Sequence, residues 1–131
     1  MRRFFRQASR GQALVEFALI IPLFLLVVVG IFEGGRALYT YSAMSNATRE
    51  ALREAIVHQN DAAIDARADR ILGGLADETT IVHDKSNCTP VKTLCMYGIE
   101  LSYDFEPVLL GPIFSPTIVA SGEMPVEAIH P

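Results

Sequence analysis

The sequence contains one long apolar run, ALVEFALIIPLFLLVVVGIF, at residues 13–32. Its twenty residues contain one charged side chain, Glu16. At a helical rise of about 1.5 Å per residue they would cross the roughly 30 Å hydrocarbon layer of a membrane. We therefore predict a transmembrane helix here.

Charge is divided unequally on the two sides of this stretch. All four charged residues before Gly11 are arginines, whereas the rest of the chain carries 7 Lys and Arg against 15 Asp and Glu, a net charge of −8. The positive-inside rule then keeps the N-terminus in the cytoplasm and sends the residues after Phe32 across the membrane. An acidic body also argues against nucleic acid as a partner, because such binding depends on Lys and Arg.

Two simpler interpretations of the N-terminus remain open. A cleaved secretory signal has a shorter apolar core and an A-x-A-like site, which GIFEGGRALYTYSA does not supply after the apolar run. The stronger rival is an unprocessed single-pass anchor that carries an envelope binding domain.

Glu16 needs an explanation, because a carboxylate costs up to about 2.5 to 3.5 kcal/mol at the bilayer centre. It either lies close enough to the interface to reach water or meets a positive partner. Cleavage after Gly11 would supply such a partner, since Gln12 would then carry a new ammonium group. Residues four apart share a helix face, so a neighbouring subunit shifted by one step could pair both charges.

The residues around this point resemble a known family. RGQALVEF, residues 10–17, resembles the processing site of type IV pilin precursors, with Glu16 followed by the aromatic Phe17. The longer stretch RGQALVEFALIIPLFLLVVVGIFEGGRALYTYSAMSNATREALREA looks like the TadE-like minor pseudopilins of Tad (tight-adherence, Flp-type) pilus systems, and the likeness covers about residues 10 to 56.

This resemblance implies a function and partners. A prepilin peptidase would cleave between Gly11 and Gln12, and Glu16 and Phe17 would serve assembly with other pilin or pseudopilin subunits. Other expected partners are the inner-membrane pilus assembly platform and the lipid bilayer. Similar proteins are minor components needed for pilus biogenesis, adhesion and biofilm formation.

Three further residues lie within or next to the apolar run. Pro22 removes one backbone hydrogen bond and is expected to kink the helix, which membrane helices tolerate; in a filament it is also a point where the helix could extend under load. Gly30 and Gly34 form a G-x-x-x-G that permits close helix packing, although this motif is common by chance in apolar segments.

The pattern after the membrane predicts an exported domain over residues 33–131. The long helix is expected from about residue 13 to 58, with an apolar stripe that packs on the domain, formed by Ala47, Ala51, Leu52, Ala55 and Ile56. Asn60 and Asp61 signal the start of a second helix over about 61–75. Residues 1–11 are then a cytoplasmic leader and residues 12–32 the transmembrane part.

The C-terminal half predicts strands. Residues 97–105 alternate apolar and polar side chains, and strands are expected over about 79–83, 95–106 and 117–126. In the connection PVLLGPIFSP, we expect the apolar side chains to pack under the sheet edge, with a partner-binding patch as the alternative; these are Leu109, Leu110, Ile113 and Phe114. The predicted fold class is α+β, with a long helix and a short helix on a small antiparallel sheet.

The two cysteines, Cys88 and Cys95, predict a disulfide on an exported domain. A metal site is the rival, but His83 is the only nearby imidazole and no C-x-x-C is present. His58 and His130 are isolated and expected to be solvated. No catalytic motif emerges, so we expect neither an enzyme nor a cofactor, metal or small-molecule substrate.

Overall fold

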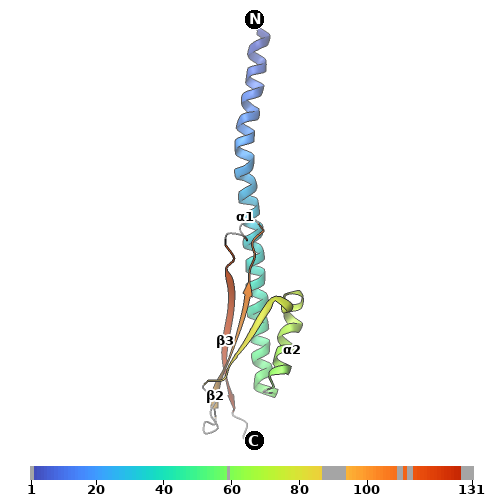
Figure 1. The fold of residues 1–131 in the computed structure, drawn as a ribbon, viewed down its shortest axis with the longest axis vertical. Coiled ribbons are helices and arrows are strands. Elements are labelled where there is room, and N and C mark those ends of the chain that lie inside the picture. The colour runs from blue at the N-terminus through green and yellow to red at the C-terminus, as the bar shows by residue number, and fades with distance from the viewer. Residues whose placement is uncertain (1, 59, 87–93, 109–110, 112–113, 128–131) are drawn as a thin grey trace. The chain divides into compact units, whose positions relative to one another are not determined.

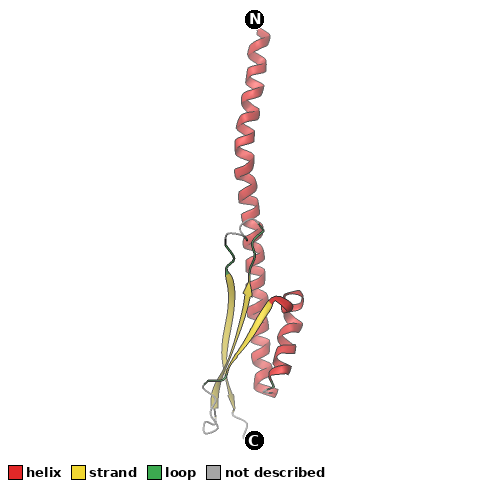
Figure 2. Cartoon of the chain, in the orientation of Figure 1, coloured by secondary structure: helices red, strands yellow, loops and turns green. Residues whose placement is uncertain are grey.

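The computed structural model describes residues 2–58, 60–86, 94–108, 111 and 114–127, and of residues 2–10 and 94 it describes the backbone alone. Its elements are drawn in Figure 1 and coloured by type in Figure 2. The chain divides into two compact units, Met1–Gly35 and Arg36–Pro131. The helix α1, Arg2–His58, contributes to both units.

In the first unit, α1 begins earlier than the sequence predicted. The expected start was near residue 13, but the helix already includes Arg2. The residues before Gly11 include Arg, Gln and Ala, which favour helices, and no proline interrupts them. Pro22 lies inside the helix, and the helical assignment continues through it.

The second unit contains a three-stranded antiparallel sheet in the order β1-β2-β3. Its strands are β1, Thr79–Asp84, β2, Leu94–Asp104, and β3, Thr117–Glu127. The β1–β2 register runs from Thr79↔Tyr103 to Asp84↔Gly98, and every residue of β2 is opposite a residue of β3. Antiparallel pairing in chain order is what short connections permit.

The second helix, α2, spans Asp61–Leu72. Asn60 caps it as expected: its side-chain oxygen accepts a hydrogen bond from the Ala62 N–H at 3.0 Å. The α-helix ends three residues before the predicted residue 75, because Gly73 takes a positive φ of 57° that glycine adopts readily. A 3-10 helix, η1, Gly73–Glu78, follows.

Both helices bury their apolar stripes against one face of the sheet. Alternate residues of β2 from Cys95 to Tyr103, with Phe105 just beyond the strand, are buried on this face. The helices supply Met44, Ala47, Ala51, Leu52, Ala55, Ile64, Ala68 and Leu72. Ile56, which we expected in the stripe, is 46% exposed, because a residue that follows Ala55 is rotated by about 100° around the helix.

Small residues at the contact allow α1 to lie close to β3. A Cβ at Gly122 would lie 2.9 Å from Leu52 Cδ1 and 3.2 Å from Thr48 Cγ2. The buried Thr48 hydroxyl donates to the Met44 carbonyl at 2.9 Å and lies 3.5 Å from the Ala120 carbonyl of β3. These contacts fix the helix against the edge strand.

Two backbone hydrogen bonds stabilise the connection from β2 to β3. The Phe105 N–H donates to the Pro116 carbonyl at 3.0 Å, and the Gly111 N–H donates to the Pro107 carbonyl at 2.7 Å. Our expectation that its apolar side chains pack under the sheet edge is wrong for Phe114, which is 59% exposed. Leu109, Leu110 and Ile113 lie outside the described residues.

The predicted α+β class is confirmed: a long apolar N-terminal helix, a second helix and a three-stranded antiparallel sheet make up the fold.

Candidate functional site

The expected processing site lies inside α1. Gly11 and Gln12 are exposed helical residues. The Gln12 side-chain Nε2 donates to Glu16 Oε1 at 3.3 Å, so residues 12 and 16 do share a helix face. In the uncleaved chain this amide provides the carboxylate with one hydrogen-bond donor, as the spacing of four residues permits.

Glu16 and Phe17 are both at the surface of the single chain. Phe17 is 61% exposed and Glu16 is also classed as exposed. No other charged residue lies within residues 13–32. A carboxylate on this otherwise apolar surface is available to a positive partner outside the chain.

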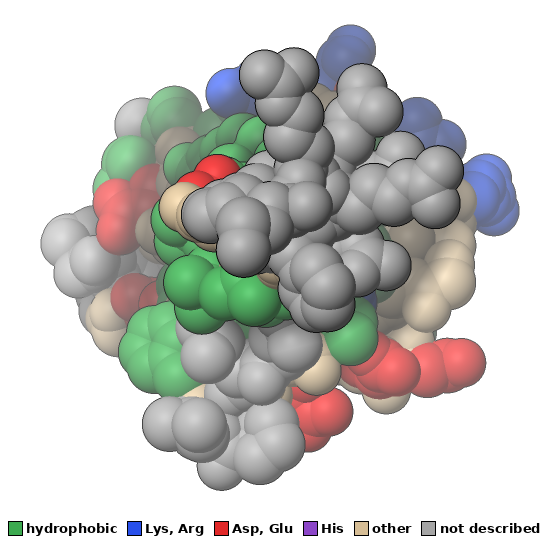
Figure 3. Space-filling view, turned by 90° about the horizontal axis from the view of Figure 1, so that it is seen from above, with side chains coloured by type: hydrophobic (Ala, Val, Ile, Leu, Met, Phe, Trp, Pro, Cys, Tyr) green, Lys and Arg blue, Asp and Glu red, His purple; other side chains and the backbone are tan. Residues whose placement is uncertain are grey.

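The apolar segment of α1 is not covered by the described part of the protein. Its large side chains from Leu14 to Phe32 are mostly more than half exposed. In the view of the molecule from above, hydrophobic and charged side chains both lie at the surface (Figure 3). The helix is long and apolar enough to cross a membrane. Since such a surface in water would be a large apolar patch, it is consistent with a single-pass membrane anchor.

Gly30 and Gly34 do not face a close neighbour within the described chain. A Cβ at either position would meet no atom within 4 Å. Close packing inside this chain therefore does not require glycine there, and a packing role would have to come from another helix. The kink at Pro22 stays a prediction.

Only one cysteine of the predicted disulfide, Cys95, lies among the described residues. Cys95 is buried on β2, at 5% exposure. Cys88 lies outside the described residues, as does His130. His58, by contrast, is not isolated: its Nδ1 lies 2.7 Å from Glu54 Oε1, one helical turn earlier, and its side chain is 60% exposed.

The structure also brings together a polar group that sequence reasoning missed, which we call the Tyr97 cluster. It joins α2, the end of β1 and its following turn, and β2 through Asp61, Asp65, His83, Lys85 and Tyr97. His83 Nε2 lies 2.8 Å from Asp65 Oδ1, and its Nδ1 lies 2.7 Å from the Tyr97 hydroxyl.

The charges in the Tyr97 cluster complement one another. The Tyr97 hydroxyl donates to Asp61 Oδ1 at 3.1 Å, and the Lys85 ammonium contacts the same carboxylate at 2.6 Å. The hydrogen bond from Lys85 lowers the pKa of Asp61, whereas burial and then the Asp61 hydrogen bond raise the pKa of Tyr97. A phenol held in its neutral form is a poor base or nucleophile, so this cluster fits a structural role.

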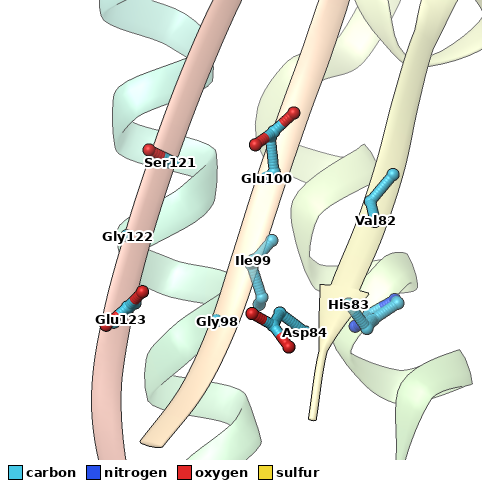
Figure 4. Close-up of a pocket in the computed structure, with 9 residues that line it drawn as sticks. All are labelled: Val82, His83, Asp84, Gly98, Ile99, Glu100, Ser121, Gly122 and Glu123. Atoms are coloured by element: carbon cyan, nitrogen blue, oxygen red, sulfur yellow. The ribbon is translucent and has the colours of Figure 1, made fainter. Parts of the chain in front are cut away.

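A surface hollow lies on the sheet face opposite the helices. Figure 4 shows Asp84 and Glu123 on either side of Gly98, with Glu100 in the next row. The missing side chain at Gly98 leaves bare backbone between the two acids. Hydrogen bonds from Ser86 lower the pKa of Asp84. Among the described residues, no group of three or more His, Cys, Asp or Glu side chains is arranged to hold a metal ion.

The long apolar helix, second helix and antiparallel sheet define a pilin-like arrangement. Residues 11–53 match the model of the TadE-like protein family, so the resemblance noted in the sequence is confirmed over these residues. The match begins at Gly11 and ends inside α1; it covers the apolar segment and most of the helix that packs on the sheet. Comparison with curated proteins and with solved structures found no match.

The TadE-like family points to a pilus component, a class that is generally non-enzymatic, and to association with Tad pilus machinery. Residues 54–131, which include α2 and the whole sheet, lie outside the matched segment.

Proposed function

We propose that this chain is a minor pilin-like subunit, a pseudopilin, of a Tad (Flp-type) pilus assembly or secretion machinery. The family match that starts at Gly11 is the observation that carries this proposal. The exposed apolar surface of α1 supports it, because such a surface needs either lipid or neighbouring helices around it. We assign the chain no catalytic role, cofactor, metal or small-molecule substrate.

In this proposal a prepilin peptidase cleaves between Gly11 and Gln12. The new ammonium of Gln12 would then lie at the same depth as Glu16, as the 3.3 Å contact between the two side chains supports. The ammonium of a neighbouring pilin or pseudopilin subunit, shifted by one step along the filament, then forms an ion pair with the Glu16 carboxylate of this one. Both buried charges are paired, which offsets the cost of leaving either alone in lipid.

The location follows from the same charges. The chain is inserted in the bacterial inner membrane with its arginine leader in the cytoplasm and residues 33–131 on the far side. There it contacts the assembly platform and contributes to pilus biogenesis and adhesion.

The decisive experiment is mass spectrometry of the full chain extracted from membranes of cells that contain the pilus machinery. We expect a mature N-terminus at Gln12 that disappears when the peptidase gene is deleted. A chain that supports pilus formation with Met1 or Arg2 still attached would instead be an unprocessed anchor with an envelope binding domain.

The role of Glu16 is tested separately. Glu16→Ala should leave insertion and cleavage unchanged but lower incorporation into the assembled complex by roughly tenfold or more, since an unpaired ammonium remains in the membrane. Glu33→Ala, which removes the next carboxylate along the helix, is the matched control. Normal incorporation of Glu16→Ala would contradict the proposed ion pair between Glu16 and the ammonium of a neighbouring subunit.

A further inference from the structure

The second unit carries exposed apolar side chains at the end where α1 enters it. Leu38, Tyr39 and Tyr41 of α1 are 69%, 71% and 52% exposed. On the connection between β2 and β3, Val108 is 77% and Phe114 is 59% exposed. We call these five residues the apolar end.

One contact holds the connection beside α1, and a second joins the two ends of the connection. The Arg36 guanidinium carbon lies 5.2 Å from the centre of the Phe105 ring, a cation–π contact. The Phe105 N–H in turn donates to the Pro116 carbonyl at 3.0 Å. Both ends of the connection are therefore fixed near the first turn of α1 in this unit.

Chain length keeps the two exposed side chains of the connection close to these fixed points. Val108 is three residues from Phe105 and Phe114 is two residues from Pro116, which limits them to about 11 Å and about 7 Å of chain. Gly111 also lies close to the Phe105 end of the connection, because its N–H donates to the Pro107 carbonyl at 2.7 Å. The apolar side chains of the connection thus belong to the same end as those of α1.

The occupant of the apolar end follows from its distance along the chain to the proposed membrane segment. Arg36 comes four residues after Phe32, so even a fully extended chain would separate them by no more than about 14 Å. The layer between the hydrocarbon and bulk water is about 5–7 Å thick on each side of a bilayer. Whatever the orientation of the domain, its Arg36 end stays close to the membrane surface.

The residue types fit that surface. Tyrosine rings, apolar with one polar atom, are enriched at both membrane–water interfaces. In a helix, long side chains lean toward the N-terminus, which for Tyr39 and Tyr41 is the direction of the apolar segment along the chain.

We infer that the apolar end rests on the lipid surface of the bilayer that holds residues 13–32, with Tyr39, Tyr41, Val108 and Phe114 in the interfacial layer. This inference depends on the membrane anchorage in the proposed function but not on cleavage or assembly. It gives the domain a second membrane contact besides the helix.

The chain contains no tryptophan, so single substitutions provide clean fluorescent probes. The full chain with Phe114→Trp, or separately Tyr39→Trp, is reconstituted into phosphatidylcholine vesicles with and without lipids brominated near the headgroup end of their acyl chains. Val82→Trp is the matched control: Val82 is 51% exposed, and its β2 partner Glu100 lies five residues, about 17 Å, from Phe105.

We expect the brominated lipids to quench Phe114→Trp and Tyr39→Trp at least about twofold more than Val82→Trp, as lipid contact at only one end of the domain requires. Equal quenching in all three variants, while the chain resists alkaline extraction from the vesicles, would overturn the inference and leave the anchor intact. Emission that shifts with protein density but is not quenched would assign the apolar end to a neighbouring subunit. Loss of the chain on alkaline extraction would contradict the anchor itself and the lipid contact with it.

Discussion

The Tyr97 hydroxyl lies among two aspartates of α2, a histidine and a lysine, and its surroundings favour the neutral phenol. Burial is the main cause of its raised pKa, followed by its hydrogen bond to Asp61. The unfolded chain ionises this group near its ordinary pKa of 10.0. The folded chain therefore loses stability as pH rises above that value, because only the unfolded state releases the proton readily.

We predict that Tyr97→Phe flattens this alkaline loss. At pH 7 the variant should be less stable by about 1 kcal/mol, because Asp61 and His83 each lose a hydrogen-bond partner. Between pH 9 and 11, its melting temperature in detergent should fall less than that of the natural chain.

Tyr39→Phe is the control, since it removes one phenol hydroxyl at a position outside the Tyr97 cluster. Parallel melting curves for the natural chain and Tyr97→Phe over this pH range would show that the phenol does not govern alkaline stability.

At the scale of elements, the close approach of α1 to β3 depends on a residue without a side chain. Gly122 faces Leu52 and Thr48, both almost fully buried. A methyl group there can fit only if one of these side chains leaves its rotamer or the helix moves away, and overpacking of this kind costs about 1–3 kcal/mol.

We predict that Gly122→Ala lowers the free energy of unfolding by about 1 kcal/mol or more. Chemical unfolding of the full chain in detergent, followed by circular dichroism, measures this. Gly74→Ala is the control, because a Cβ at Gly74 would meet nothing within 4 Å and no positive φ is required there. Equal stabilities of the two variants would mean that the helix–strand contact is looser than described.

Local patterns predicted both α-helices and all three strands, because each depends on residues that are neighbours in sequence, but they missed the early start of α1 and the 3-10 helix η1. The alternation of residues 97–105 predicted β2, and Asn60 predicted the start of α2. The Tyr97 cluster could not be predicted in this way, since Asp61 and Tyr97 lie 36 residues apart and meet only through the register of β1 with β2. The exposure of Phe114 likewise depends on which surfaces the fold leaves uncovered.

The candidate site was predicted from a sequence motif rather than from secondary-structure patterns. Gly11, Gln12, Glu16 and Phe17 were recognised from their spacing, and the family match over residues 11–53 supports that recognition without testing the role of any one of them. The function proposed for them involves a peptidase and a neighbouring subunit, which a single chain does not contain.

For the whole molecule, orientation depends on how charge is distributed. The four leader arginines lie on one side of the apolar segment, and the net charge of the rest is −8. We predict that changing all four to alanine weakens the N-in orientation, because the positive-inside bias is removed. Protease added to spheroplasts should then digest the domain in roughly half of the molecules or fewer, against nearly all in the natural chain.

The control changes four arginines of the domain instead, Arg49, Arg53, Arg67 and Arg70. These lie beyond the apolar segment, and their loss should leave the domain fully accessible. Unchanged accessibility in the leader variant would show that something other than the arginines sets the direction of insertion.

The continuous helix around Gly11 bears on the cleavage proposed at this position. A peptide bond inside an α-helix has its carbonyl and N–H already engaged, so an enzyme that grips extended backbone must first melt about one turn. Glycine weakens a helix by roughly 0.5–1 kcal/mol relative to alanine, and no packing within the described chain calls for it at this position. If a peptidase cleaves after Gly11 as proposed, this glycine lowers the free-energy cost of opening the helix at the cleavage site.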